Sequence, residues 1–254
     1  MHVAITGASS GIGAALAHEF DKPGSAVTLV ARRQALLEAL AASLAAKAHV
    51  AVADLSDTAH CTDWIAGAEA ALGPIDILIN NAGSTMVQRF VDVDADEAER
   101  MLRLDLINPM RISRAVLPAM TARRSGTIVD VCSVAAFAAL LGTTYYAAAK
   151  AGLAAASEVL RGELRGTGVH VVTVYPGPIR TAMSTQAFDS FEDHWTKKLA
   201  AEAAPEKLAA KIRHAVERRR PRVIFPGGYT VARHAPNMAR WLLDRFTPPV
   251  RRTP

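Results

Sequence analysis

The hydrophobic pattern divides the chain into short apolar runs and longer stretches in which apolar residues recur with a helical period. Most apolar runs are continuous rather than alternating with polar residues, which is typical of strands buried on both faces of a sheet. They occupy residues 2–6, 26–31, 48–53, 75–80, 126–132, 169–175 and 222–225. The helical stretches lie near residues 12–21, 33–46, 57–72, 94–122, 146–166 and 205–218. This alternation predicts an α/β fold, a three-layer doubly wound parallel sheet of the Rossmann type in a single domain.

Two segments fall outside this alternation. Residues 182–204 form an unusually long connection between a strand and a helix, and contain Phe188, Phe191 and Trp195. Long connections in compact α/β domains are often lids over a ligand site. The aromatic side chains could equally pack in the core, and both interpretations stay open. We expect the main domain to cover residues 1–225, with residues 226–254 as a basic, aromatic extension.

The composition supports one globular domain, because 254 residues that are 50% hydrophobic suffice for a substantial core. The only two cysteines, Cys61 and Cys132, are far apart, so a disulfide framework is not expected. The chain begins without a basic segment or cleavage site, and its longest apolar run, residues 134–141, is far shorter than a membrane span. We therefore expect a cytoplasmic protein. The histidines lack the spacing of metal ligands, so no metal site is expected.

The net charge of +5 is unevenly distributed. Residues 205–254 carry twelve Lys and Arg against three Asp and Glu, whereas the rest of the chain carries 17 against 21. Such a basic end could face an anionic substrate, a membrane or nucleic acid, or could simply be a solvated face. No nucleic-acid-binding signature accompanies it, so no nucleic-acid partner is expected.

The sequence "MARWLLDRF" at 238–246 combines large apolar side chains with two arginines. A short basic amphipathic helix could rest on an anionic membrane surface. We favour the alternative that it covers the pocket of its own or a partner subunit.

The stretch "TGASSGIG" at 6–13 follows the first predicted strand and opens the first predicted helix. A strand–turn–helix of this kind directs free backbone N–H groups and a helix N-terminus at an anion. Gly7 permits a tight turn, while Gly11 and Gly13 lack the Cβ atoms that would keep a pyrophosphate and the neighbouring strand away. In this position the pattern predicts a dinucleotide site.

The end of the second predicted strand bears on the choice of dinucleotide. Ala31 stands where an acid would normally hold a ribose 2′-hydroxyl, and Arg32 and Arg33 follow. A planar guanidinium suits a 2′-phosphate, so we expect NADP(H) in preference to NAD(H). Alternatively, both arginines are surface residues at the start of a helix. Asp54, after the third strand, could accept a hydrogen bond from an adenine amino group or serve as a turn or cap residue.

The stretch "TTYYAAAK" at 143–150 contains two tyrosines and a lysine. A tyrosine with a pKa near 10 is a poor base at neutral pH, and a nearby ammonium lowers that pKa. Residues four apart share a helix face, so Tyr146 is the neighbour of Lys150 whereas Tyr145 points away. Ser133 ends the fifth strand at the edge where open α/β sheets bind ligands. Its hydroxyl can donate to a substrate carbonyl oxygen.

Several motifs occur in a fixed order along the chain: "TGASSGIG" at 6–13, "NNAG" at 80–83, Ser133, the Tyr146-x-x-x-Lys150 pair and "PGPIRT" at 176–181. Together, over about residues 1–183, they resemble the short-chain dehydrogenase/reductase family. The resemblance implies a Rossmann-type fold, a nicotinamide cofactor and chemistry on a carbonyl or an alcohol. It implies cofactor contacts from Gly7, Ser9, Ser10, Gly11, Ile12, Gly13, Arg32, Arg33, Asp54, Leu55, Asn81, Ala82, Gly83, Tyr146, Lys150, Pro176, Gly177, Ile179 and Thr181.

The chain departs from the family where a catalytic asparagine is usual in the fourth helix. Counting 22 residues from Gly83 and aligning "PMRISRAVLPAM" places that position at Asp105 rather than at Asn108. An aspartate could preserve a kink and a water through its backbone carbonyl. Its charge would oppose phenolate formation and raise the pKa of Tyr146, and Lys150 would offset this. Our hypothesis is an active enzyme with Asp105 as fourth catalytic residue and an altered proton relay.

Family members build the substrate pocket from the segments after the serine and after the "PG" turn. The corresponding residues are mainly apolar, namely Phe137, Leu141, Tyr145, Met183 and Phe188, and suit a hydrophobic ketone or secondary alcohol. The resemblance also suggests a homodimer or homotetramer formed through the helices near 94–122 and 146–166.

We therefore predict an NADP(H)-dependent oxidoreductase acting on such substrates, with Ser133, Tyr146, Lys150 and Asp105 as catalytic residues. Two alternatives stay open. One is a non-catalytic nucleotide-sensing regulator on the same fold, for which Asp105 is the only support. The other is a membrane-associated acyl-chain ketoreductase.

Overall fold

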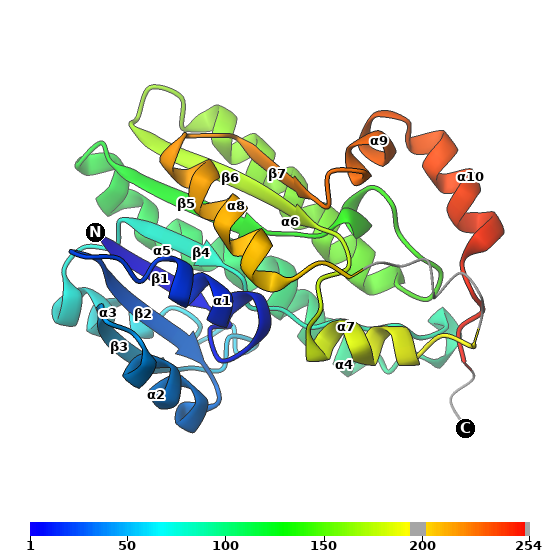
Figure 1. The fold of residues 1–254 in the computed structure, drawn as a ribbon, viewed down its shortest axis with the longest axis horizontal. Coiled ribbons are helices and arrows are strands. Elements are labelled where there is room, and N and C mark those ends of the chain that lie inside the picture. The colour runs from blue at the N-terminus through cyan, green and yellow to red at the C-terminus, as the bar shows by residue number, and fades with distance from the viewer. Residues whose placement is uncertain (194–201, 252–254) are drawn as a thin grey trace.

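The computed structural model describes residues 1–193 and 202–251. Its centre is a seven-stranded parallel sheet with the strand order β3-β2-β1-β4-β5-β6-β7 (Figure 1). The strands are β1 (His2–Thr6), β2 (Ala26–Ala31), β3 (Lys47–Val52), β4 (Ile77–Asn80), β5 (Gly126–Val131), β6 (Val169–Pro176) and β7 (Arg222–Phe225). The strand order reverses between β1 and β4, and ligands of doubly wound sheets bind at the carboxyl ends beside such a switch point. The predicted fold class is confirmed.

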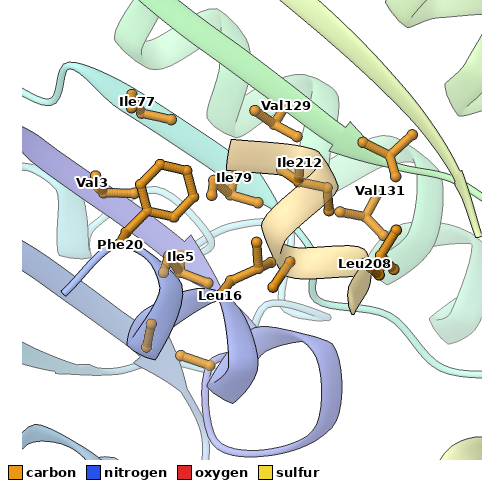
Figure 2. Packing of buried hydrophobic residues seen from close by; sticks show 14 of the residues in the cluster. Val3, Ile5, Leu16, Phe20, Ile77, Ile79, Val129, Val131, Leu208 and Ile212 are labelled. Atoms are coloured by element: carbon orange, nitrogen blue, oxygen red, sulfur yellow. The ribbon is translucent and has the colours of Figure 1, made fainter. Parts of the chain in front are cut away.

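Helices cover both faces of this sheet. One face is covered by α1 (Gly11–Glu19), α2 (Gln34–Ser43) and α8 (Pro205–Glu217), and the other by α3 (Trp64–Leu72), α5 (Asn108–Ala122) and α6 (Thr144–Glu163). Successive side chains of a strand point to opposite faces. Consequently β1 directs Val3 and Ile5 toward α1 and α8, where they are fully buried with Leu16 (Figure 2), and directs Ala4 toward the opposite cluster.

The predicted helix over 94–122 is divided into three parts. It consists of α4 (Ala95–Leu102), a π-helical turn η2 (Arg103–Ile107), and α5, which has Pro109 in its first turn. Proline has no N–H group for the helical hydrogen-bond ladder, so a change of helix here is expected. The π turn contains Asp105, and turns of this kind are frequent at functional sites.

Two other elements differ from the prediction. Helix α3 begins at Trp64 rather than near residue 57, because Asp54 and Asp57 accept hydrogen bonds from Ser56 N and Ala59 N in tight turns. The connection after β6 contains a helix, α7 (Ala182–Asp189), capped by the side chain of Thr181. Trp195 lies outside the described residues.

Two helices follow β7, α9 (Tyr229–His234) and α10 (Pro236–Phe246). Both lie beyond the carboxyl end of β7, and the chain then runs from α10 toward the end of α7 (Figure 1). Helix α10 exposes an apolar face, most strongly at Trp241, whose exposed fraction is 63%. Within the two described ranges, no helix is long and apolar enough to span a bilayer.

Candidate active site

The glycine-rich turn between β1 and α1 is packed tightly against the loops around it. Gly7 and Gly11 have φ angles of +67° and +56°, which L side chains rarely adopt. A Cβ atom on Gly7 would lie 2.8 Å from Ala82 Cα, and one on Gly13 would lie 2.2 Å from the Gly7 carbonyl oxygen. A Cβ atom on Gly11 would lie 3.0 Å from Thr181 Cγ2. These glycines therefore bring the turn against the loops that follow β4 and β6.

The "NNAG" loop after β4 is tied to the end of β1 and to the sheet. Backbone N–H groups of Asn81 and Ala82 each donate to Thr6 Oγ1 at 3.0 Å, and Asn81 Nδ2 donates to the Thr6 carbonyl at 2.9 Å. Asn80 is buried, and its Nδ2 donates to Ser113 Oγ and Asp130 Oδ1, both at 2.8 Å. Asn80 thus links β4 with α5 and β5, while Asn81 and Ala82 face the ligand edge.

Arg33 connects the end of β2 with the glycine-rich turn. Its Nη2 atom donates to Ser9 Oγ at 2.8 Å and to Ser10 Oγ at 2.7 Å. Arg32 lines the same part of the cavity as Arg33 and Asp54. Asp54 Oδ1 accepts from Ser56 N at 2.9 Å, so the residue forms a turn and also lines the cavity.

The predicted acid–base group lies where β5 ends and α6 begins. Ser133 lies two residues after the last residue of β5, and its Oγ accepts from Ala135 N at 3.1 Å. Tyr146 stands in the first turn of α6, and Lys150 follows one turn later. Lys150 is almost fully buried, with Nζ 3.3 Å from the Val131 carbonyl oxygen and 6.0 Å from the Tyr146 ring centroid. The structure thus brings Ser133, Tyr146 and Lys150 together.

Opposing influences act on the phenol of Tyr146. Burial raises its pKa, and the negative charge of Asp105 raises it further. The positive charge of Lys150 and a hydrogen bond with Ser133 lower the pKa. The net result is a pKa above the usual value for tyrosine. Protonated tyrosine is therefore favoured near neutral pH.

Asp105 in η2 is fully buried beside Lys150. Its Oδ1 accepts from Ser84 N at 2.8 Å, and its Oδ2 lies 3.2 Å from Lys150 Nζ. Burial raises the pKa of the Asp105 carboxyl, and Lys150 opposes this rise. Burial lowers the pKa of Lys150, but the charges of Asp105 and Tyr146 outweigh it, and the pKa is raised overall.

Two neighbouring residues bear on the position of this pair. A Cβ atom on Gly83 would lie 3.1 Å from Asp105 Oδ2 and 3.2 Å from Lys150 Nζ, so glycine leaves the pair its space. Asn108 is directed elsewhere, because its buried Nδ2 donates to the Leu55 carbonyl at 2.8 Å. The geometry therefore agrees with Asp105, rather than Asn108, as the residue beside Lys150.

A cavity of about 450 Å³ lies at the carboxyl edge of the sheet. Every predicted cofactor residue except Gly13 lines it, and so does Ser133. Gly13 packs instead beneath the turn, and Asp105 contacts Lys150 from behind the cavity wall. The cavity runs from Arg32 and Arg33 at the end of β2 to Lys150 on α6.

The predicted substrate residues divide into two groups. Met183 and Phe188 on α7 line the cavity, whereas Phe137, Leu141 and Tyr145 are not among the residues that line it, and a substrate role for these three stays a prediction. Phe137 packs on Tyr175 with ring centroids 5.5 Å apart. The Tyr145 ring stacks on the Phe90 ring, with centroids 5.6 Å apart. Tyr145 precedes Tyr146 by one residue, so its side chain points about 100° away from that of Tyr146 around the helix axis. Leu141 is 43% exposed.

Other residues complete the apolar end of the cavity. Leu140 and Phe191 line it, as do Thr85 and Val87 from the segment after "NNAG". The sequence contained a signal for the last two residues, because they follow β4 at the carboxyl edge. Sequence reasoning placed the pocket only after Ser133 and after the "PG" turn, and so missed them.

Comparison with known proteins places the chain in a family. The model for short chain dehydrogenases matches residues 1–191. An NADP-dependent 3-hydroxy acid dehydrogenase of Schizosaccharomyces pombe is 32% identical over 245 residues, covering 91% of this chain and 95% of that protein. The ketoacyl reductase HetN of Nostoc sp. is 32% identical over 226 residues, which cover 87% of this chain and 77% of HetN.

A solved structure agrees with these relatives. The short-chain dehydrogenase from Sphingobium yanoikuyae in complex with NADPH superimposes with a TM-score of 0.81 and 31% identity, covering 99% of this chain and 98% of that one. The fold, the order of the motifs and these similarities lead to one conclusion: the chain belongs to the short-chain dehydrogenase/reductase family and is an NAD(P)-dependent oxidoreductase.

Proposed function

We propose that the protein is an NADP(H)-dependent carbonyl reductase or alcohol dehydrogenase for hydrophobic ketones and secondary alcohols. The observation that carries the proposal is the placement of Ser133, Tyr146 and Lys150 on one cavity that is also lined by Leu140, Phe188 and Phe191. Membership of a family of enzymes argues against the non-catalytic regulator.

The residues present fit a nicotinamide dinucleotide. The left-handed Gly7 and Gly11 form a turn at the N-terminus of α1, where free N–H groups favour a pyrophosphate. The cavity continues from this turn to Lys150, the residue that would hold the nicotinamide ribose, and to Ile179 and Thr181 after β6. A bound nicotinamide would supply or accept the hydride.

NADP(H) is the form that the end of β2 favours. Ala31 is buried and carries no carboxylate that would repel a 2′-phosphate. The Arg32 and Arg33 side chains border the cavity beside Ser9, and a guanidinium can give a phosphate two charge-assisted hydrogen bonds. The NADPH-bound relative from Sphingobium yanoikuyae and the NADP-dependent relative from Schizosaccharomyces pombe are consistent with this proposal.

In the reducing direction, Ser133 would donate a hydrogen bond to the carbonyl oxygen and stabilise the charge that develops there. Tyr146 would then give its phenolic proton to that oxygen. The neighbouring ammonium of Lys150 would stabilise the phenolate that remains. In the oxidising direction the same phenolate would take the proton of the alcohol. Asp105 would act through Lys150, because its carboxyl lies 3.2 Å from Nζ.

The substrate class rests on the side chains near Ser133. Leu140, Met183, Phe188 and Phe191 give this end of the cavity an apolar wall, which favours an aliphatic or alicyclic group beside the carbonyl. The membrane-associated alternative is less well supported. Arg240 on α10 is paired with Asp244 and donates to the Ala139 carbonyl at 3.1 Å, so this arginine binds the protein itself.

The oligomeric state stays a prediction. Ile107, Met110 and Val159 are exposed on η2, α5 and α6, the elements through which a homodimer or homotetramer was expected to form. These exposed apolar side chains are what supports it.

The test is a panel of ketones and alcohols of increasing apolar size, each assayed with NADPH or NADP⁺ and with NADH or NAD⁺. Tyr146→Phe should lower kcat by at least about 100-fold while retaining NADPH binding, since it removes the acid–base group. Tyr145→Phe is the matched control, because its ring stacks on Phe90 outside the cavity, and it should stay within about twofold. Equal activity in both variants would refute the assignment.

A further inference from the structure

The last described residues of the chain pair with the segment that follows α7. We call residues 247–251 the C-terminal strap. Glu192 N donates to the Pro249 carbonyl and Arg251 N donates to the Ser190 carbonyl, each at 2.9 Å. Phe191 and Val250 face each other in an antiparallel bridge. Two segments about sixty residues apart thus form a short two-stranded ladder.

The Arg251 side chain adds to this ladder. Its Nε donates to the Phe191 carbonyl at 2.9 Å, and its Nη2 lies 3.3 Å from Asp193 Oδ1. Arg251 therefore binds two successive carbonyl oxygens, that of Ser190 through its main-chain N–H and that of Phe191 through its guanidinium. In Figure 1 the red chain after α10 descends along the end of α7, as these contacts require.

The other side of the strap contacts the loop after β5. Val250 lies so close to Gly142 that a Cβ atom there would be 2.5 Å from Val250 Cγ2. Gly142 also has a φ of +78° and accepts a hydrogen bond from Gln88 N at 2.9 Å. Leu140, two residues before Gly142, lines the apolar end of the cavity. The strap therefore lies between two walls of that end.

Phe191 is the residue on which these contacts converge. Phe191 lines the cavity and is only 3% exposed, although it lies beyond the last residue of α7. Strand-like pairing fixes both the backbone position of a residue and the face to which its side chain points. Pairing with the strap accordingly orients Phe191 toward the cavity.

We propose that the C-terminal strap is a specificity-determining element, which holds Phe191 against the apolar end of the cavity and thereby limits the size of the substrate. The inference rests on the proposed hydrophobic substrate class. The strap does not touch the substrate in this proposal; it is a positioning element that acts through Phe191. It needs no partner subunit, because both segments belong to one chain.

The experiment compares a truncation after Thr247, Arg251→Ala and Phe191→Ala across the ketone series, with saturating NADPH. When two substrates differ in size by a few methylenes, removing an apolar wall changes the ratio of their kcat/KM values by about tenfold. We expect the ratio of kcat/KM for the bulkiest and smallest ketones to rise by about tenfold in the truncated protein and in Phe191→Ala, and by about threefold in Arg251→Ala. NADPH affinity should stay within about twofold of wild type, as for a change outside the cofactor site.

Combining the truncation with Phe191→Ala separates a positioning role from general destabilisation. If the strap acts through Phe191, the double variant should show no further change in the ratio beyond either single variant. Additive changes would overturn the proposal, and so would an unchanged ratio in the truncated protein. The matched control is Arg245→Ala on α10, whose guanidinium stacks on Phe246 of its own helix and should leave the ratio unchanged.

Amide hydrogen exchange provides a readout that does not depend on turnover. Truncation should speed exchange of Glu192 N by at least about tenfold, since its acceptor Pro249 is removed. Unchanged protection would overturn the strap proposal. A wild-type protein that turns over no ketone or alcohol would instead refute the proposed function, while the exchange result would still decide whether the strap holds this segment.

Discussion

The buried carboxyl beside Lys150 makes Asp105→Asn the most informative perturbation of the proposed site. The substitution keeps the side-chain shape and can keep the hydrogen bond from Ser84 N, which Oδ1 accepts at 2.8 Å. It removes one negative charge from a position 3.2 Å from Lys150 Nζ. The phenol of Tyr146 then has a positive neighbour whose charge is no longer balanced. Its pKa should fall.

The size of the change follows from two distances. Lys150 Nζ lies 6.0 Å from the Tyr146 ring centroid and 3.2 Å from Asp105 Oδ2, so the carboxylate is no farther from the ring than these two distances combined. At an effective dielectric constant of about 20, a unit charge contributes about 3 kcal/mol at about 6 Å and about 2 kcal/mol at about 9 Å. The charges of Lys150 and Asp105 therefore act on the pKa of Tyr146 in opposite directions and with comparable strength. Removing the Asp105 charge removes about 2 kcal/mol of opposition to ionisation of the phenol, so we expect the pKa of Tyr146 to fall in Asp105→Asn.

The assay is the pH dependence of kcat/KM, measured in both directions with saturating cofactor. Oxidation needs the phenolate, so its rate rises as pH increases through the pKa of Tyr146. Reduction needs the protonated phenol, so its rate falls over the same range. Both midpoints should move to lower pH in Asp105→Asn, by the same amount. Asp105→Ala would remove the hydrogen bond to Ser84 as well, and should give a similar shift with a lower rate.

Asp130→Asn is the matched control. Asp130 is another buried carboxyl that Lys150 influences, but it accepts a hydrogen bond from Asn80 Nδ2 at 2.8 Å, whereas Asp105 forms the ion pair with Lys150. Its midpoints should stay in place. Unchanged midpoints in Asp105→Asn would refute the reasoning, since Asp105 would then carry no charge at the working pH. A shift to higher pH would refute it too, since Lys150 would then have lost its proton together with its partner.

Two further predictions concern the cofactor and the stability of the fold. Arg32→Glu should reduce the ratio of kcat/KM for NADPH to kcat/KM for NADH by about tenfold or more, because a charge-assisted hydrogen bond to phosphate contributes about 1.5–3 kcal/mol. Steady-state kinetics measure this ratio. A preference for NADH that the substitution leaves unchanged would contradict the NADP(H) proposal. Hydrogen bonds from Arg222 lower the pKa of Glu158 from 4.5 to about 2, against the opposing effect of burial, and Tyr175 and Arg161 lower it further. The ionised Glu158 therefore stabilises the folded protein above pH 4.5, and this stabilisation is lost as pH falls toward 2. Glu158→Gln should lower the free energy of unfolding at pH 7 by about 2–3 kcal/mol, with the difference from wild type shrinking in acid; urea titrations at several pH values measure it, and a difference that does not vary with pH would contradict this origin.

The sheet could be predicted from the sequence because its strands are buried on both faces, which leaves continuous apolar runs such as Ile77–Ile79. The glycine-rich turn and Tyr146 were predictable for a similar reason. Each depends on short-range spacing, and the structure keeps that spacing: Gly13 packs on the Gly7 carbonyl, and Lys150 lies one helical turn after Tyr146.

Features that long-range packing decides were harder to predict. The substrate role of Leu141 and Tyr145 stays a prediction, and the stacking of the Tyr145 ring on Phe90 had no signal in the sequence. The π turn at Asp105 and the strap pairing at Phe191 leave no periodic pattern in the sequence, since each depends on a partner distant in the chain. Helix α7 did have a local signal, because Thr181 is a favourable N-cap residue and its side chain accepts a hydrogen bond from Ser184 N at 3.2 Å.

The charge balance of the site has a consequence for the direction of the reaction. A lysine without an ionic partner would direct its whole positive charge toward lowering the pKa of the catalytic tyrosine. Here Lys150 is shared between the Asp105 carboxylate and Tyr146, and the pKa of Tyr146 stays above its usual value. The populated form near neutral pH is therefore the protonated phenol, which is the form that can donate a proton to a carbonyl oxygen. Oxidation would first require removal of that proton. We accordingly expect reduction to be faster than oxidation at neutral pH, and the ratio of the oxidation rate to the reduction rate to increase as pH rises. In Asp105→Asn, the pH at which the two rates are equal should be lower than in the wild type.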